Sequence, residues 1–363
     1  MTAEITLPGR PLVVRTPDWP VRSPPPVRRA VFAAAHVAAF PDGTIDWPAT
    51  MAFRDYLWGL GFGVADAMDT AQRGMGLSWP QVRELVAASG RRATGPLACG
   101  AGTDQLPDPS ASLVDIAAAY REQVDMVQDA GARVILMASR ALARAGSGPA
   151  DYRDLYGELI ASAREPVILH WLGGMFDPLL AGYWGSENLD EATETVLAII
   201  AAQPARVDGI KVSLLDAARE IALRRRLPPG VRLYTGDDFH YPELIEGDER
   251  GHSDALLGVF AAIARPAAAA LRALDSDDIP GYRAAMAPTV PLARHIFAAP
   301  TYHYKTGIAF LAWLNGFQEH FAMLGEQRHA RSTEHLIRLF ELAADAGVLA
   351  DPELAVTRMR TLL

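Results

Sequence analysis

The chain has 363 residues, of which 50% are hydrophobic and 21% charged, and its formal net charge is −9 at neutral pH. This length and composition predict a sizeable buried core, and the acidic balance excludes a basic nucleic-acid footprint. The single cysteine, Cys99, excludes intramolecular disulfides and thiolate metal clusters. No apolar run reaches spanning length and no signal-peptide pattern is present, so we expect a cytoplasmic protein without membrane or nucleic-acid partners.

Prolines interrupt the first segment, residues 1–28, which we expect to be an irregular extension closed by Pro24, Pro25 and Pro26. After it, short apolar runs alternate with longer amphipathic stretches. Near-continuous apolar runs are typical of strands buried on both faces of a parallel sheet. The eight candidate strands are residues 30–35, 63–68, 96–100, 133–138, 166–171, 207–212, 231–236 and 255–260.

The stretches between these runs have helical periodicity. Residues 115–130 carry one apolar stripe and end at Gly131, while residues 190–202 carry another behind Asp190, a plausible N-cap. Eightfold strand–helix alternation predicts an α/β protein, a (β/α)8 TIM barrel over residues 29–264. A doubly wound sheet gives the same alternation, but residues 35–39 are not the glycine-rich loop expected there.

From Arg265 onward the strand pattern stops. The remaining stretches are helix-like, so residues 265–363 are predicted to form a C-terminal helical extension packed on the barrel. The predicted helices cover residues 266–274, 280–297, 304–323 and 334–346.

Catalytic residues of a barrel lie at the carboxyl ends of its strands, and Lys211 is the most informative residue there. It stands in an apolar run, where burial lowers a lysine's pKa and supplies the neutral amine that attacks a carbonyl carbon. From the pattern alone, a lysine paired with a core carboxylate, or one that extends out of the barrel, explains the position equally well.

Residues 209–211, Gly-Ile-Lys, resemble the strand that carries the Schiff-base lysine of the dihydrodipicolinate synthase and N-acetylneuraminate lyase superfamily. Other stretches resemble this superfamily in the same order: residues 40–46 its first loop, 166–170 its fifth strand, 235–238 its seventh strand and 304–307 the start of its C-terminal helices. The resemblance, over about residues 31–321, implies a class I carbon–carbon lyase, aldolase or dehydratase acting on a keto compound. It further implies an imine on Lys211, no organic cofactor, and a homo-oligomer.

The departures from the superfamily pattern bear on the substrate. His170 stands where the family has a proton-relaying tyrosine, and imidazole shuttles protons near neutral pH; the alternative is a histidine that only binds a loop. Asp69 and Thr70 align with the family's pair of small hydroxyl residues that bind the substrate carboxylate. An aspartate there repels a carboxylate and suits sugar hydroxyls, so we expect a sugar-derived keto compound rather than pyruvate.

Four further residues are candidate substrate-binding groups. Asp238 lies where lyases of the superfamily contact a polyol, and Arg140 where others hold a distal carboxylate; a turn or cap and a surface salt bridge are the respective alternatives. His36 and His240 also follow predicted strands.

Two other classes of function stay open at this point. His36, Asp69, His170 and His240 together suit zinc or manganese, as in a metal-dependent sugar isomerase, epimerase or class II aldolase, although no local ligand spacing supports this. A non-enzymatic binding barrel is the third class. Titratable residues at many strand ends argue against it.

Overall fold

The protein is described by a computed structural model that covers residues 2–16, 18–106 and 110–363. Its central feature is a closed barrel of eight strands in the order β10-β3-β4-β5-β6-β7-β8-β9. The strands are β3 (Val31–Ala34), β4 (Gly63–Asp66), β5 (Leu97–Ala101), β6 (Arg133–Leu136), β7 (Val167–Leu172), β8 (Val207–Ser213), β9 (Arg232–Thr235) and β10 (Asp254–Leu257). Each overlaps one predicted run, and the predicted (β/α)8 fold is confirmed.

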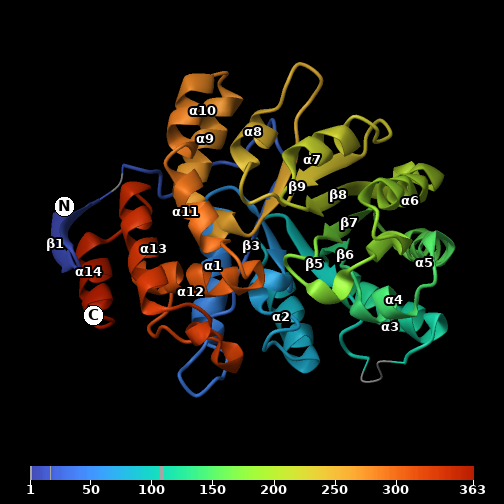
Figure 1. The fold of residues 1–363 in the computed structure, drawn as a ribbon, viewed down its shortest axis with the longest axis horizontal. Helices are drawn as coiled ribbons and strands as arrows, with labels where there is room; N and C mark the ends of the chain where they lie inside the picture. Colours follow the sequence, from blue (N-terminus) through green and yellow to red (C-terminus); the bar gives the residue numbers. More distant parts are fainter. Residues whose placement is uncertain (1, 17, 107–109) are drawn as a thin grey trace. The chain divides into compact units, whose positions relative to one another are not determined.

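The chain divides into two compact units, which we describe separately. Unit 1 comprises residues 1–64, 68–77 and 257–363, and unit 2 comprises residues 65–67 and 78–256. Within unit 2, helices lie on the outer side of strands β6–β9 (Figure 1). The helices of unit 2 are α2 (Trp79–Arg92), α3 (Leu113–Asp129), α4 (Arg140–Ala145), α5 (Pro149–Ser162), α6 (Leu189–Ala202), α7 (Ala217–Arg224) and α8 (Tyr241–Glu246).

Helix α3 forms as its sequence predicts. Ser112 and Asp115 make a reciprocal capping box at its start, and Gly131, at φ +75°, follows its end in the left-handed conformation that glycine tolerates. The apolar stripe of the helix is buried. Capping therefore fixes where this helix starts, and burial of its apolar stripe holds it against the barrel.

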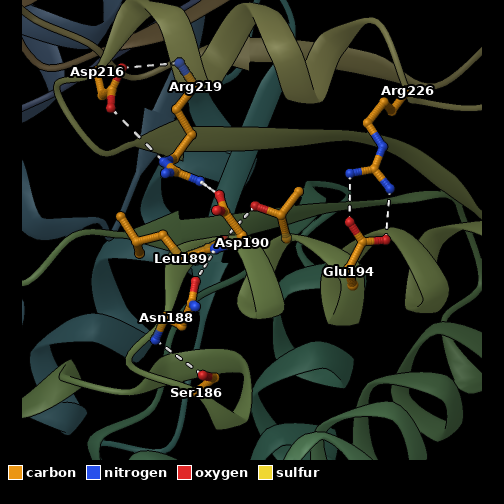
Figure 2. A network of polar contacts seen from close by, with 9 residues as sticks. Ser186, Asn188, Leu189, Asp190, Glu194, Asp216, Arg219 and Arg226 are labelled. Atoms are coloured by element: carbon orange, nitrogen blue, oxygen red, sulfur yellow. Dashed lines mark hydrogen bonds and ion pairs between the residues drawn. The ribbon is translucent and has the colours of Figure 1, made fainter.

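Helix α6 begins one residue earlier than predicted, and its N-cap is Asn188 rather than Asp190. The Asn188 side chain accepts a hydrogen bond from the amide of Asp190 at 2.8 Å. The backbone amides of the first turn need such a partner because the helix itself supplies none. Asp190 instead accepts a hydrogen bond from Arg219 of α7 at 2.7 Å. Arg226, just after the end of α7, donates two hydrogen bonds to Glu194 of α6 (Figure 2).

Unit 1 contains the C-terminal helices and α1 (Trp47–Gly59). The predicted helix over residues 280–297 is two helices, since Ala287 and Pro288 separate α10 from α11. The predicted helix over residues 304–323 ends at Leu314, where Asn315 caps it and Gly316 takes a φ of +79°. The helices are α9 (Ala264–Asp275), α10 (Ile279–Met286), α11 (Thr289–Ile296), α12 (Tyr304–Leu314), α13 (Thr333–Asp345) and α14 (Pro352–Arg360).

The N-terminal segment is not irregular throughout, as the sequence suggested. Strands β1 (Thr2–Leu7) and β2 (Arg10–Arg15) pair antiparallel around a turn at Pro8 and Gly9. Ile5 and Leu7 are buried while Thr6 between them is exposed, the period-two pattern of a half-buried strand. Arg360 of α14 donates to the carbonyl of Glu4 at 2.8 Å, which ties the two ends of the chain together.

No helix in the described part of the chain combines the length and the apolar character needed to cross a lipid bilayer.

Candidate active site

Strand β8 carries Lys211 between two neighbouring strands. Lys211 is level with His170 of β7 on one side and with Tyr234 of β9 on the other. Its side chain is buried, with 7% of the residue exposed. Because parallel strands at the same level place equivalent residues on the same face, Lys211 and His170 are neighbours on one face of the sheet.

Gly236, which follows β9, makes room for the lysine side chain. A Cβ atom at this position would lie 2.8 Å from Cε of Lys211 and would also collide with Oγ of Ser213. Real Cβ atoms do not approach other atoms this closely, so any other residue at position 236 displaces Lys211 or Ser213. The glycine therefore leaves room for the Lys211 and Ser213 side chains in their present positions.

His170 is fully buried beside Lys211. Its Nε2 lies 3.5 Å from Oγ of Ser213, and its Nδ1 has no hydrogen-bond partner among the described residues. Burial, and then the charge of Lys211, lower the pKa of His170 well below 6.5. The imidazole is therefore neutral at neutral pH, with capacity to accept a proton from a neighbouring group.

The loop after β9 holds an aspartate and a histidine in direct contact. Asp237 is buried, and its Oδ2 lies 2.9 Å from Nδ1 of His240. Its Oδ1 accepts the backbone amides of Phe239 at 2.8 Å and His240 at 3.0 Å. Asp238, the predicted substrate-binding residue, is also buried here, with 3% exposed. Sequence reasoning named His240 and Asp238 but missed Asp237 as the partner of His240.

A buried network lies behind this loop. The Asp237 amide donates to Oγ1 of Thr235 at 3.1 Å, and the Thr235 hydroxyl donates to Glu220 of α7 at 3.0 Å. Ser253 also donates to Glu220, at 2.8 Å. Burial raises the pKa of Glu220 to about 8, against the effect of these two hydrogen bonds. Both residues that flank Gly236 are therefore held by buried polar contacts.

The predicted site residues of unit 1 follow strands β3 and β4. Nε2 of His36 lies 3.1 Å from Oε1 of Gln318, and the ring packs edge-on against Phe53. The Thr70 hydroxyl lies 2.8 Å from the hydroxyl of Tyr304, a contact that sequence reasoning did not find. Asp69 lies beside it at the start of a short 3-10 turn and is half-buried.

Arg140 makes the surface salt bridge that the sequence left open as its alternative. Its Nε lies 2.6 Å from Oδ2 of Asp177, and almost half of its side chain is exposed. Arg140 begins α4, which Ser139 caps by accepting the amide of Leu142 at 3.1 Å. A role of Arg140 in substrate binding stays a prediction.

The structure brings together Lys211, His170 and Ser213 in unit 2, with Gly236 next to them. Ser213 and Gly236 were missed by sequence reasoning, although Ser213 is two positions after Lys211 and thus on the same face of its strand. Among the described residues, no group of three or more His, Cys, Asp or Glu side chains is arranged to hold a metal ion.

Known proteins resemble this chain mainly in structure. A family model described as "Protein of unknown function (DUF993)" matches residues 10–363. No curated protein matches the sequence. The crystal structure of dihydrodipicolinate synthase from Thermotoga maritima superposes with a TM-score of 0.69 at 16% identity, over 88% of this chain and 99% of that one. The enzyme from Aquifex aeolicus gives a TM-score of 0.69 at 13% identity, over 88% and 99%.

A third similar structure is a prophage protein of the dihydrodipicolinic acid synthase family from E. coli K12, solved in complex with pyruvate. It gives a TM-score of 0.69 at 15% identity and covers 89% of this chain and 99% of that one. At such identities the likeness establishes the fold, and the chemistry has to be argued from the residues of this chain.

Proposed function

We propose that this chain, which belongs to the family described as "Protein of unknown function (DUF993)", is a class I lyase. In the proposed reaction, Lys211 forms a Schiff base with a keto substrate. The observation that carries the proposal is the position of Lys211, buried in β8, level with His170 and given space by Gly236. The barrel that places these residues is the fold of dihydrodipicolinate synthases.

His170 supports the proposal because imine formation needs a neighbouring group that moves protons. When the amine of Lys211 attacks a carbonyl carbon, a C–N bond forms and the carbonyl oxygen becomes a hydroxyl group. A neutral imidazole accepts the proton that the nitrogen loses and returns it to this hydroxyl, which leaves as water. The low pKa of His170 keeps the imidazole neutral for this role.

The substrate we propose is an uncharged, sugar-derived ketone. By resemblance, Asp69 and Thr70 take the place of the two hydroxyl residues that bind a carboxylate in the superfamily. Asp69 is anionic where those residues are neutral, so a 2-oxo acid is disfavoured and a hydroxylated ketone is favoured. The same resemblance favours a homo-oligomer, and the sequence pattern favours a cytoplasmic location.

The experiment is borohydride trapping with pyruvate, hydroxyacetone and dihydroxyacetone as probes. Reduction of an imine adds the mass of the reduced ketone irreversibly to the protein, which intact-mass spectrometry measures. We expect an adduct with at least one of the two uncharged ketones in the unchanged protein and none in Lys211→Arg. Lys305→Arg is the matched control and should keep the adduct. An unlabelled wild-type protein with all three ketones, or equal labelling of Lys211→Arg, overturns the proposal.

A further inference from the structure

The cleavage of a carbon–carbon bond through an imine requires proton transfers at two separate places. One is at the nitrogen and the former carbonyl oxygen, next to Lys211. The other is at the hydroxyl group two carbons away, whose proton must be removed as the bond breaks. His170 is level with Lys211 and is placed for the first transfer. The second needs another base, further toward the carboxyl ends of the strands.

We infer that His240, oriented by Asp237, is this second base; the inference rests on the proposed function and names a further catalytic residue for it. Asp237 accepts the Nδ1 proton of His240 at 2.9 Å. This contact selects the tautomer whose Nε2 carries a lone pair. The contact with Asp237 uses Nδ1 and not Nε2, and the His240 side chain is 30% exposed. The imidazole is thus both oriented and accessible.

The aspartate of this pair is itself rigidly held. Oδ1 of Asp237 accepts two backbone amides, and the Asp237 amide donates to Thr235, which donates to Glu220. A carboxylate that is fixed by these hydrogen bonds holds the imidazole in one orientation. It also stabilises the imidazolium that forms when the imidazole takes up a proton. His170 has no such partner at Nδ1 among the described residues. The two histidines are therefore built for different tasks.

The position of the pair fits a base that acts away from the imine. Lys211 is level with Tyr234, and β9 ends at Thr235, so Asp237 and His240 lie in the loop that follows the carboxyl end of this strand. Bond cleavage that uses one base at the imine and a second base at a hydroxyl group requires a β-hydroxy ketone. We therefore expect a β-hydroxy ketone as the substrate class for this step.

The proposed step is balanced in atoms and electrons. His240 takes the hydroxyl proton, and the O–H electron pair becomes the π bond of an aldehyde. The carbon–carbon bond next to it breaks, and its electron pair forms a double bond to the imine carbon. The former C=N pair returns to nitrogen, which leaves an enamine on Lys211. Protonation of the enamine carbon and addition of water then release the ketone fragment.

The test separates this step from imine formation by measuring three reactions of His240→Gln. The first is borohydride trapping of hydroxyacetone, the second is exchange of the hydroxyacetone C–H protons in deuterium oxide, and the third is aldol addition of hydroxyacetone to glyceraldehyde. The first requires only the imine on Lys211, the second requires the imine and its enamine, and neither requires the base that removes a β-hydroxyl proton. We expect them within about twofold of the unchanged enzyme, and the third reduced by about 10²- to 10⁴-fold.

Two further variants distinguish catalysis from structural support. In His240→Ala, added imidazole should restore part of the aldol addition, an effect that a purely structural histidine does not show. His329→Gln, a change at an exposed histidine of unit 1, should leave all three reactions unchanged.

Loss of all three reactions together in a folded His240→Gln, or full aldol activity, would overturn the inference while leaving the Schiff base intact as a proposal. Absence of any adduct in the unchanged enzyme would instead overturn the proposed function itself.

Discussion

The two ends of the strands in unit 2 differ in the charged groups that they bring together. At the amino ends, Asp208 of β8 accepts hydrogen bonds from Arg133 at 3.0 Å and from Arg232 at 3.1 Å. The Tyr234 hydroxyl donates to the same carboxylate at 2.6 Å. Arg232 also pairs with Asp254 of β10 at 3.1 Å. Each of these charges thus lies against an opposite charge, and the group links β6, β8, β9 and β10.

At the carboxyl ends, the neighbouring basic groups are Lys211 and His170, which repel when both are protonated. Burial, together with the charge of Lys211, lowers the pKa of His170. Gly236 supplies space instead of a side chain. The comparison indicates that ion pairs at the amino ends stabilise the barrel, whereas at the carboxyl ends the burial of His170 lowers its pKa at a cost in stability.

The largest expected effect is at the carboxyl ends. Lys211→Met removes the proposed nucleophile, and a covalent nucleophile accounts for on the order of 10⁶ in rate. We expect aldol activity to fall to background while the free energy of unfolding stays equal or rises, since a buried amine is replaced by an apolar chain of similar length. Steady-state kinetics and denaturant unfolding measure the two quantities. Substantial remaining activity contradicts the comparison.

The next effect concerns the choice of ketone. If a substrate carboxylate came within about 4 Å of Asp69, the two charges would repel by about 4 kcal/mol at an effective dielectric near 20, a factor of roughly a thousand in affinity. Asp69→Thr should therefore strengthen pyruvate binding strongly and change hydroxyacetone binding little. Calorimetry on both proteins measures this. Tight pyruvate binding that is indifferent to the substitution would show that Asp69 does not face the substrate.

At the amino ends of the strands, we expect substitutions to lower stability and to leave activity unchanged. Asp208→Asn leaves Arg133 and Arg232 without their shared carboxylate, and we expect a loss of about 2 kcal/mol in the free energy of unfolding, because both arginines keep partial solvent contact. Activity at a temperature where the variant is folded should be unchanged. Tyr234→Phe, which removes one hydrogen bond to the same carboxylate, should cost about 1 kcal/mol. A fall in kcat without a fall in stability would reverse the assignment.

A smaller effect is the acid sensitivity caused by His170. Its pKa in the folded state is well below 6.5, so below pH 6.5 the unfolded chain binds a proton that the folded chain does not. His170 therefore does not lower the free energy of unfolding above pH 6.5, and it lowers this free energy increasingly as the pH falls below 6.5. His170→Gln should flatten this part of the profile in denaturant titrations between pH 7.5 and 5. An identical slope in both proteins argues that His170 is protonated in the folded state.

The smallest expected effect is that of chelation. A Schiff-base enzyme should keep its activity in an excess of EDTA, because no step uses a metal ion. Activity that is lost with a stoichiometric metal and restored by its return would transfer the chemistry to His36, Asp69, His170 and His240.

The fold could be predicted from the sequence because strand runs such as residues 207–212 are apolar without interruption, and this pattern leaves few alternatives. The N-terminal hairpin was missed since Pro8 and Pro11 suggested an irregular segment. Pro8 lies in the turn, however, and Pro11 lies near the strand start, where a missing amide is tolerated. Prolines in a sequence therefore indicate a turn between two strands as readily as they indicate an irregular segment.

The candidate site was only partly predictable. Lys211 and His170 stand out in apolar strands, and their neighbouring positions follow from the order of the strands. The contacts of Asp237 with His240 and of Thr70 with Tyr304 depend on loop conformation and on helix packing, which periodicity does not encode. The role of Gly236 is visible only from the distance to the Lys211 side chain. Sequence patterns thus locate reactive residues better than the residues that orient them.

The position of the label after borohydride reduction tests the central claim most directly. The chain contains only two lysines, Lys211 and Lys305, so peptide mapping gives an unambiguous answer. Both are buried, and Nζ of Lys305 donates to the carbonyl of Tyr302 at 3.1 Å. We predict that, after incubation with hydroxyacetone or dihydroxyacetone, the reduced adduct is found on the Lys211 peptide alone. An adduct on Lys305, or turnover of a ketone with no adduct on Lys211, would contradict the account.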